Sequence, residues 1–310
     1  MQTYKIENGA IVACDKASAT IFLVTASSET NRQEMFKSLK FDKYDLESSL
    51  DPDEISRIEF NDDLTMLIVK VPKKAVVKEN IRFEVSSAGI FLEKEKVTFI
   101  LDSGTIEFGS KVFLGVTSIT DVVLRFLLMT VHHFVQHLKV IKQITSEIQY
   151  KINSSMENKY LLQMFDLGES LIYYIHSIES NGSVIAKLNH NPGKMKLSED
   201  QIERLSDTLL ENQQCAKQST IYSSVLSGLM DARGNIINNN MNVLLKKLTL
   251  INVVFLPLNL VAGILGMSEY SVMTKHLDWR ISYSVFMVAM VFLGWISWVL
   301  IVRIIDRQPK

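Results

Sequence analysis

The chain ends in two long apolar stretches that are separated by a short polar segment. No charged residue occurs from Leu248 to Met267 or from Ile281 to Val302. A helix of about 20 residues is about 30 Å long, which is enough to cross the hydrocarbon core of a bilayer. Helices of soluble proteins are rarely apolar on every face over such a length. The pattern therefore predicts two membrane-spanning helices, 248–267 and 281–302, joined by an outer loop, 268–280, rather than a buried hairpin of a soluble protein.

Basic residues near the ends of these spans predict the orientation of the chain. Lys246 and Lys247 precede the first span and Arg303 follows the second, whereas the loop between the spans mixes basic with acidic residues. Lysine and arginine next to a span favour the cytoplasmic side. We therefore expect a multi-pass protein of the cell (inner) membrane, with the N-terminal part and the tail 304–310 in the cytoplasm.

The first part of the chain, residues 1–116, has the pattern of a compact α/β domain. Short runs of β-branched and apolar residues predict strands, and two pairs of runs flank polar turns, at Asn61-Asp62 and at 93–96. Residues 30–40 and 46–54 have helical spacing or a helix-and-turn composition. A domain of this length can form a core of its own.

From Ser118 the apolar period changes to that of helices, and residues 117–247 are predicted to be helical. The second of three predicted helices ends near Asn181-Gly182, a common C-cap signal. The third begins after Ser198, a plausible N-cap, and no proline follows until Pro257. One continuous helix, 198–267, is therefore predicted to run into the membrane as the first span of the two-span region 248–303. Such a long helix needs partners along its length, which favours self-association.

One face of this long helix combines amides, leucines and glycines. Steps of four and three residues select Asn238, Asn242, Leu245, Thr249, Asn252, Leu256, Asn259, Gly263 and Gly266. An unpaired amide that faces lipid costs about 1 kcal/mol or more, so these side chains must face other helices or water. Two interpretations remain open. The amides form hydrogen bonds between helices of an oligomer, or they line a pore with one helix from each subunit.

Composition and motifs exclude several functional classes. The formal net charge of −1 argues against a nucleic-acid partner. Cys14 and Cys215 match no metal-ligand spacing, and His133 and His137 lack a third ligand at a suitable spacing, so a polar helix face is the simpler interpretation of the histidines. Since neither a Walker-type phosphate loop nor a recognisable catalytic set is present, we expect no enzyme activity and no organic cofactor.

The end of the first span resembles the signature of the CorA-type magnesium transporters. That family carries Pro-Leu and Gly-Ile before a Gly-Met-Asn motif. The matching residues here are Pro257, Leu258, Gly263, Ile264, Gly266 and Met267, with Ser268 in place of the asparagine. The similarity continues upstream through MDARGNIINNNMNVLLKKLT and downstream to Tyr283.

The resemblance implies a funnel-shaped homopentamer with a cytoplasmic α/β domain, a long helical stalk and two C-terminal transmembrane helices. Its partners would be other copies of the chain, membrane lipid and divalent cations, with Mg²⁺ as the transported ion. The implied pore positions are Asn242, Leu245, Leu248, Leu256, Asn259, Gly263, Gly266, Met267 and Ser268. Between Asn242 and Gly266, this set includes Leu248, which the steps of four and three residues do not select. It lacks Thr249 and Asn252, which those steps do select. Asp231 falls where the family has a carboxylate of a regulatory magnesium site.

Two departures from the family pattern bear on the expected function. Ser268 offers a shorter hydroxyl instead of an amide, which predicts weaker or broader selectivity. The segment PKKAVVKEN is basic where the family often has the acidic partner of the regulatory site, so Asp231 has no evident partner. Besides a magnesium transporter, the alternatives are a transporter of zinc, cobalt or nickel and a non-conducting pentameric membrane scaffold.

Overall fold

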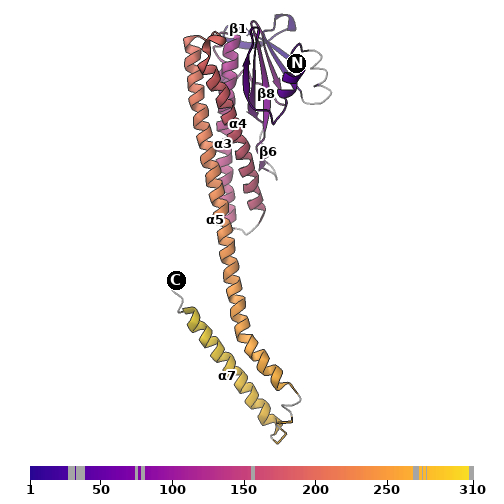
Figure 1. Ribbon diagram of the computed structural model, residues 1–310, viewed down its shortest axis with the longest axis vertical. Coiled ribbons are helices and arrows are strands. Elements are labelled where there is room, and N and C mark those ends of the chain that lie inside the picture. Colours follow the sequence, from indigo (N-terminus) through magenta and orange to yellow (C-terminus); the bar gives the residue numbers. More distant parts are fainter. Residues whose placement is uncertain are drawn as a thin grey trace. The chain divides into compact units, whose positions relative to one another are not determined.

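The computed structural model describes residues 1–26, 32, 39–73, 76–77, 81–154, 158–267, 272–273, 275–276 and 278–306 (Figure 1). The chain divides into two units, Met1–Met230 and Asp231–Lys310. Unit 1 contains the sheet and a helical bundle, and unit 2 contains two long apolar helices. The helix α5 (Glu199–Leu265) begins in the first unit and ends in the second.

A seven-stranded, mostly antiparallel sheet forms the N-terminal layer of unit 1. Its strand order is β2-β1-β3-β9-β8-β5-β4, and only β3 and β9 pair in parallel. The strands are β1 (Gln2–Glu7), β2 (Ala10–Ala13), β3 (Ile21–Thr25), β4 (Arg57–Phe60), β5 (Leu64–Pro72), β8 (Val85–Glu93) and β9 (Val97–Leu101). A separate two-stranded ribbon consists of β6 (Val76–Val77) and β7 (Ile81–Arg82).

Helices cover both faces of this sheet. Alternate residues of the central strands, such as Leu67 and Phe99, pack with α3 (Ile119–Ser154) and α4 (Asn158–His190) in the main core. The neighbouring residues Met66 and Ile100 face the other way, toward α2 (Lys43–Ser48). This two-sided burial follows from the period of two in a β-strand. The first part of α5 runs alongside α3 and α4 (Figure 1), and short 3₁₀ turns occur at Lys16–Ser18, Lys111–Phe113 and Pro192–Lys194.

Both hairpins predicted from the sequence are confirmed. β4 and β5 are antiparallel across the turn at Asn61, whose N–H donates to the carbonyl of Leu64 at 3.0 Å. β8 and β9 are antiparallel across 93–96, where the Glu93 N–H donates to the Lys96 carbonyl at 2.8 Å. The strand β1 was not predicted. The helix expected at 30–40 falls largely on 27–31 and 33–38, which lie outside the described residues.

The predicted end of the second helix at Asn181-Gly182 is wrong, because α4 continues to His190. Asn181 anchors the helix to the sheet: its Nδ2 donates to the Lys70 carbonyl at 2.7 Å and its Oδ1 accepts from the Lys70 N–H at 2.8 Å. At Gly182, an added Cβ would lie 2.7 Å from Nδ2 of Asn212 in α5. The glycine therefore permits a close crossing of α4 and α5. Asn181 and Gly182 do not end the helix but contact the sheet and α5.

Replacing Gly182 by alanine is expected to destabilise unit 1 by about 1–3 kcal/mol, because the new methyl overpacks the crossing. Gly168→Ala in the same helix is the matched control, since its Cβ would make only an ordinary contact, 3.7 Å from Leu226. That control is expected to be neutral or slightly stabilising because alanine favours helix. Far-UV circular dichroism during thermal unfolding of the detergent-solubilised protein measures both. Equal unfolding temperatures for the two variants would contradict the proposed crossing.

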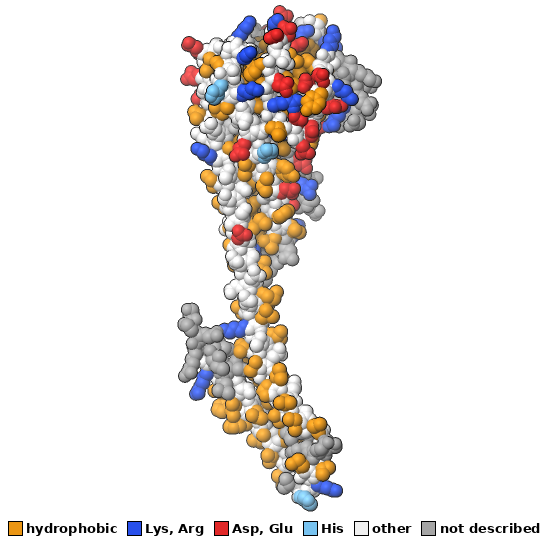
Figure 2. All heavy atoms as spheres, viewed as in Figure 1, with side chains coloured by type: hydrophobic (Ala, Val, Ile, Leu, Met, Phe, Trp, Pro, Cys, Tyr) orange, Lys and Arg blue, Asp and Glu red, His pale blue; other side chains and the backbone are white. Residues whose placement is uncertain are grey.

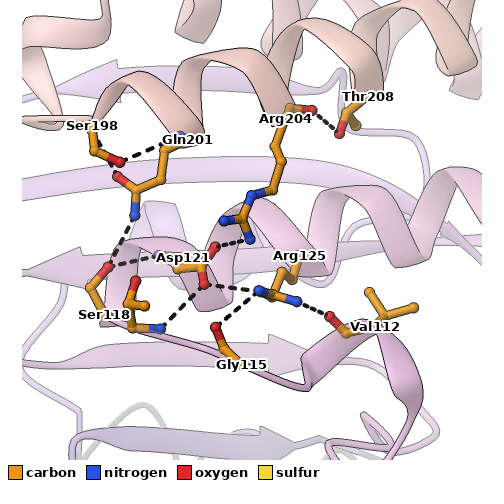
Figure 3. Close-up of polar contacts among 10 residues, drawn as sticks. Val112, Gly115, Ser118, Asp121, Arg125, Ser198, Gln201, Arg204 and Thr208 are labelled. Atoms are coloured by element: carbon orange, nitrogen blue, oxygen red, sulfur yellow. Dashed lines mark hydrogen bonds and ion pairs between the residues drawn. The ribbon is translucent and has the colours of Figure 1, made fainter. Parts of the chain in front are cut away.

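A polar network joins the N-terminal ends of α3 and α5 (Figure 3). Ser198 caps α5 as predicted: its Oγ accepts from the Gln201 N–H at 3.4 Å, and Gln201 Oε1 accepts from the Ser198 N–H at 3.0 Å. Gln201 Nε2 also donates to Ser118 Oγ at 3.2 Å, and the same oxygen accepts from the Asp121 N–H at 3.1 Å. The two helix starts are thus held together by their own caps.

Asp121 is the charged centre of this network (Figure 3). Its side chain is only 1% exposed, and its Oδ2 accepts from Arg125 Nε at 3.0 Å and from the Thr117 N–H at 3.3 Å. Oδ1 accepts from Arg204 of α5 at 3.5 Å. Arg125 also donates to the carbonyl of Val112. A buried carboxylate with this many donors fixes α5 against α3.

Candidate ion pathway

Unit 2 consists mainly of two helices that are long and apolar enough to cross a membrane. The most apolar windows in the described parts of α5 and α7 (Trp279–Asp306) have mean hydropathies of 1.8 and 1.7, and none of either window is buried. On the face shown in Figure 2, hydrophobic side chains cover much of unit 2, in the lower part of the view. Exposed apolar helices of this length match the two spans expected from the sequence.

The apolar part of α5 contacts α7 on one face. Leu250, Val254, Leu258 and Val261 are half-buried, whereas most of their neighbours are exposed. Their spacing of three or four residues places them on one side of the helix. A Cβ at Gly294 of α7 would lie 3.8 Å from Leu258 Cδ1, so the glycine marks the place where the two helices contact. The helix α7 therefore packs on this face of α5.

The predicted pore residues lie on the opposite face of α5. Successive helical residues are rotated by about 100°, which places Asn252, Leu256 and Asn259 about half a turn from the face that contacts α7. Every predicted position from Asn242 to Met267 is exposed in the single chain, and Leu256 is 68% exposed. Ser268 lies outside the described residues. One surface of α5 thus carries the predicted positions from Asn242 to Gly263, and the contact with α7 leaves it open.

The amides on this face have no partner in the described part of the chain. No hydrogen bond there involves the side chain of Asn242, Asn252 or Asn259, whereas the Thr249 hydroxyl donates to the Leu245 carbonyl at 2.9 Å. Within a bilayer such amides need other subunits or water, because lipid offers them nothing to bind. Thr249 and Asn252 were not among the positions implied by the family resemblance, but the step of four and three residues along the sequence finds both.

The predicted regulatory position, Asp231, is exposed at the start of unit 2. The basic segment 72–80, where an acidic partner was expected, falls partly on 74–75 and 78–80, which lie outside the described residues. The regulatory magnesium site therefore stays a prediction.

Two histidines of α3, His132 and His137, contact side chains of neighbouring helices, whereas His133 is exposed. His137 Nδ1 lies 2.7 Å from the hydroxyl of Tyr174 in α4, and burial lowers the pKa of His137 and raises the pKa of Tyr174. His132 Nε2 lies 2.9 Å from Glu211 Oε2 in α5. Among the described residues, no group of three or more His, Cys, Asp or Glu side chains is placed to hold a metal ion. The polar atoms of these two histidines thus contribute to the contacts of α3 with α4 and α5.

Comparison with known proteins identifies the family of this chain. The family model described as "CorA-like Mg2+ transporter protein" matches residues 17–303. The chain belongs to this CorA-like family. A curated relative, the cobalt/magnesium transport protein CorA of Methanocaldococcus jannaschii, is 24% identical over 233 residues, which cover 72% of each chain. The family membership confirms the predicted resemblance, and it identifies the chain as a transporter of the CorA type rather than an enzyme.

Two solved structures share the fold over nearly the whole chain. The complete structure of the CorA magnesium transporter from M. jannaschii matches with a TM-score of 0.74 at 18% identity, covering 99% of this chain and 97% of that chain. The full-length CmaX protein matches with a TM-score of 0.69 at 12% identity, covering 97% and 96%. The predicted order of an α/β domain, a long helix and two C-terminal apolar helices is confirmed by these matches.

Proposed function

We propose that this CorA-like chain forms a homopentameric channel that carries hydrated divalent cations, Mg²⁺ above all, through a pore lined by α5 of each subunit. The observation that carries the proposal is the open face of α5, where unpaired amides alternate with leucines opposite the face that contacts α7. Five such faces around an axis would give the amides water and ions in place of lipid. Both termini would then lie in the cytoplasm.

The chemistry of this face suits a hydrated magnesium ion. Mg²⁺ gives up its water reluctantly, so neutral amides that accept hydrogen bonds from ion-bound water suit transport better than a cage of carboxylates. A membrane potential of 100 mV, negative inside, supplies about 4.6 kcal/mol for each divalent ion that moves inward. The relative in M. jannaschii is named as a cobalt/magnesium transport protein, and this name supports cobalt as a second candidate ion.

Uptake into liposomes that contain the purified full-length protein tests the proposal. We expect Mg²⁺ entry that rises with an inside-negative potential and falls about tenfold or more in Asn259→Leu, which replaces an amide with an apolar side chain. Val254→Ile, on the face that contacts α7, is the matched control and is expected to transport normally. Co²⁺, Ni²⁺ and Zn²⁺ are measured in parallel to identify the preferred ion. If no ion enters at any potential, the chain is a membrane scaffold and the proposal is wrong.

A further inference from the structure

We propose that Asn252 forms a second ring of amides in the pore, a binding site for a hydrated divalent cation on the cytoplasmic side of Leu256. The inference rests on the proposed function, because it needs the pore that α5 lines. It adds Asn252, which the helical period of the sequence selects, to the positions implied by the family resemblance.

The position of Asn252 around the helix is the first argument. Rotations of about 100° per residue put Asn252 within about 40° of Leu256, Asn259 and Gly263, about 120° from Leu258 and about half a turn from Val261. Asn252 therefore lies at the centre of the open face rather than at its edge. In a ring of helices, side chains at the centre of the inward face point toward the axis, whereas those at its edges contact neighbouring helices.

The surroundings of Asn252 are the second argument. The side chain is exposed, has no hydrogen-bond partner in the described part of the chain and lies within a stretch that has no charged residue. In the described residues α7 supplies no partner, since it contacts α5 at Leu258, about 120° away around the helix. A polar group placed in this way within a membrane is costly unless it meets water or another subunit, so its presence marks a polar path.

The spacing along the axis gives the site its role. Asn252 and Asn259 are one heptad apart, or about 10.5 Å, and Leu256 lies between them. A hydrated ion that approaches the ring of leucines would find amide acceptors for its water molecules on both sides. One weak site on each side of the constriction allows an ion to enter and leave the pore without tight binding. When both sites are occupied, repulsion between the two ions helps one of them to leave.

Flux measurements on Asn252 variants of the full-length protein in liposomes test the site. Asn252→Leu is expected to lower potential-driven Mg²⁺ uptake roughly tenfold, because one set of acceptors is lost. Asn252→Asp is expected to lower the half-saturating Mg²⁺ concentration by about tenfold, since carboxylates bind the ion more strongly than amides do. Asn252→Gln keeps the amide and should retain most of the flux, and Val254→Ile serves as the control on the face that contacts α7.

Native mass spectrometry of each variant in detergent separates an ion site from a contact between helices. The proposal is overturned if Asn252→Leu transports normally while Asn259→Leu does not, and in that case the pore itself stands. It is also overturned if Asn252→Leu dissociates the oligomer and Asn252→Asp leaves the Mg²⁺ dependence unchanged, because the amide then only joins subunits. Absence of flux in the wild-type protein overturns the proposed function and this site together.

Discussion

The Ser268→Asn variant is expected to take up Mg²⁺ about tenfold faster than the wild-type protein at low Mg²⁺, which corresponds to about 1.4 kcal/mol of improved ion binding. Ser268 stands where the CorA family has the asparagine of its Gly-Met-Asn signature. An amide reaches farther than a hydroxyl and offers a stronger carbonyl acceptor to the water molecules around the ion. The prediction rests on the sequence, since residue 268 lies outside the described residues.

Uptake at several Mg²⁺ concentrations, with Co²⁺ as a competitor, measures this effect. The asparagine variant should also discriminate more strongly between the two ions. Ser268→Ala is the matched control and should transport less than the wild-type protein, because it lacks the hydroxyl. If the wild-type chain supports magnesium-limited growth as well as Ser268→Asn does, the serine does not limit Mg²⁺ uptake and the prediction is wrong.

Asp121→Ala is expected to destabilise unit 1 by about 3–5 kcal/mol, because removing one partner of a buried ion pair leaves the other charge uncompensated. The Arg125 side chain is 13% exposed and would lose the carboxylate that it contacts at 3.0 Å. Arg204 would lose its contact with α3, and the Thr117 N–H would lose its acceptor. The expected result is a loosened start of α5, with faster hydrogen exchange in α3 and in the first turns of α5.

Hydrogen–deuterium exchange of peptides from α3 is the suitable measurement. All three tryptophans, Trp279, Trp295 and Trp298, belong to unit 2, so tryptophan fluorescence would not report on unit 1. Asp63→Ala serves as the control, since its ion pair with Lys94 is exposed and such pairs contribute little. Similar protection of α3 in the two variants would show that the Asp121 network is not needed for stability.

Local sequence was sufficient to predict the elements in which the apolar–polar pattern and the turn residues indicate the same structure. The β4–β5 and β8–β9 hairpins were predicted because alternating apolar residues flank short polar turns. The pair Asn181-Gly182 was misinterpreted because the same two residues serve either a helix cap or a close crossing, and only the contact with Asn212 decides between them. The strand β1 was missed because its apolar side chains, Tyr4 and Ile6, are only partly buried and its partners on both sides, β2 and β3, come later in the chain.

The sequence by itself determined the two long apolar helices and predicted the register of the polar face, from Asn242 through Asn252 to Gly266. Helical period and bilayer thickness are local constraints, so periodicity and the absence of charge were enough. Only the tertiary structure decided that α7 covers the Leu258 side and leaves the amides open, and that Asp121 meets Arg204 across 83 residues. Contacts between distant segments depend on how whole helices pack, and no short stretch of sequence contains that information.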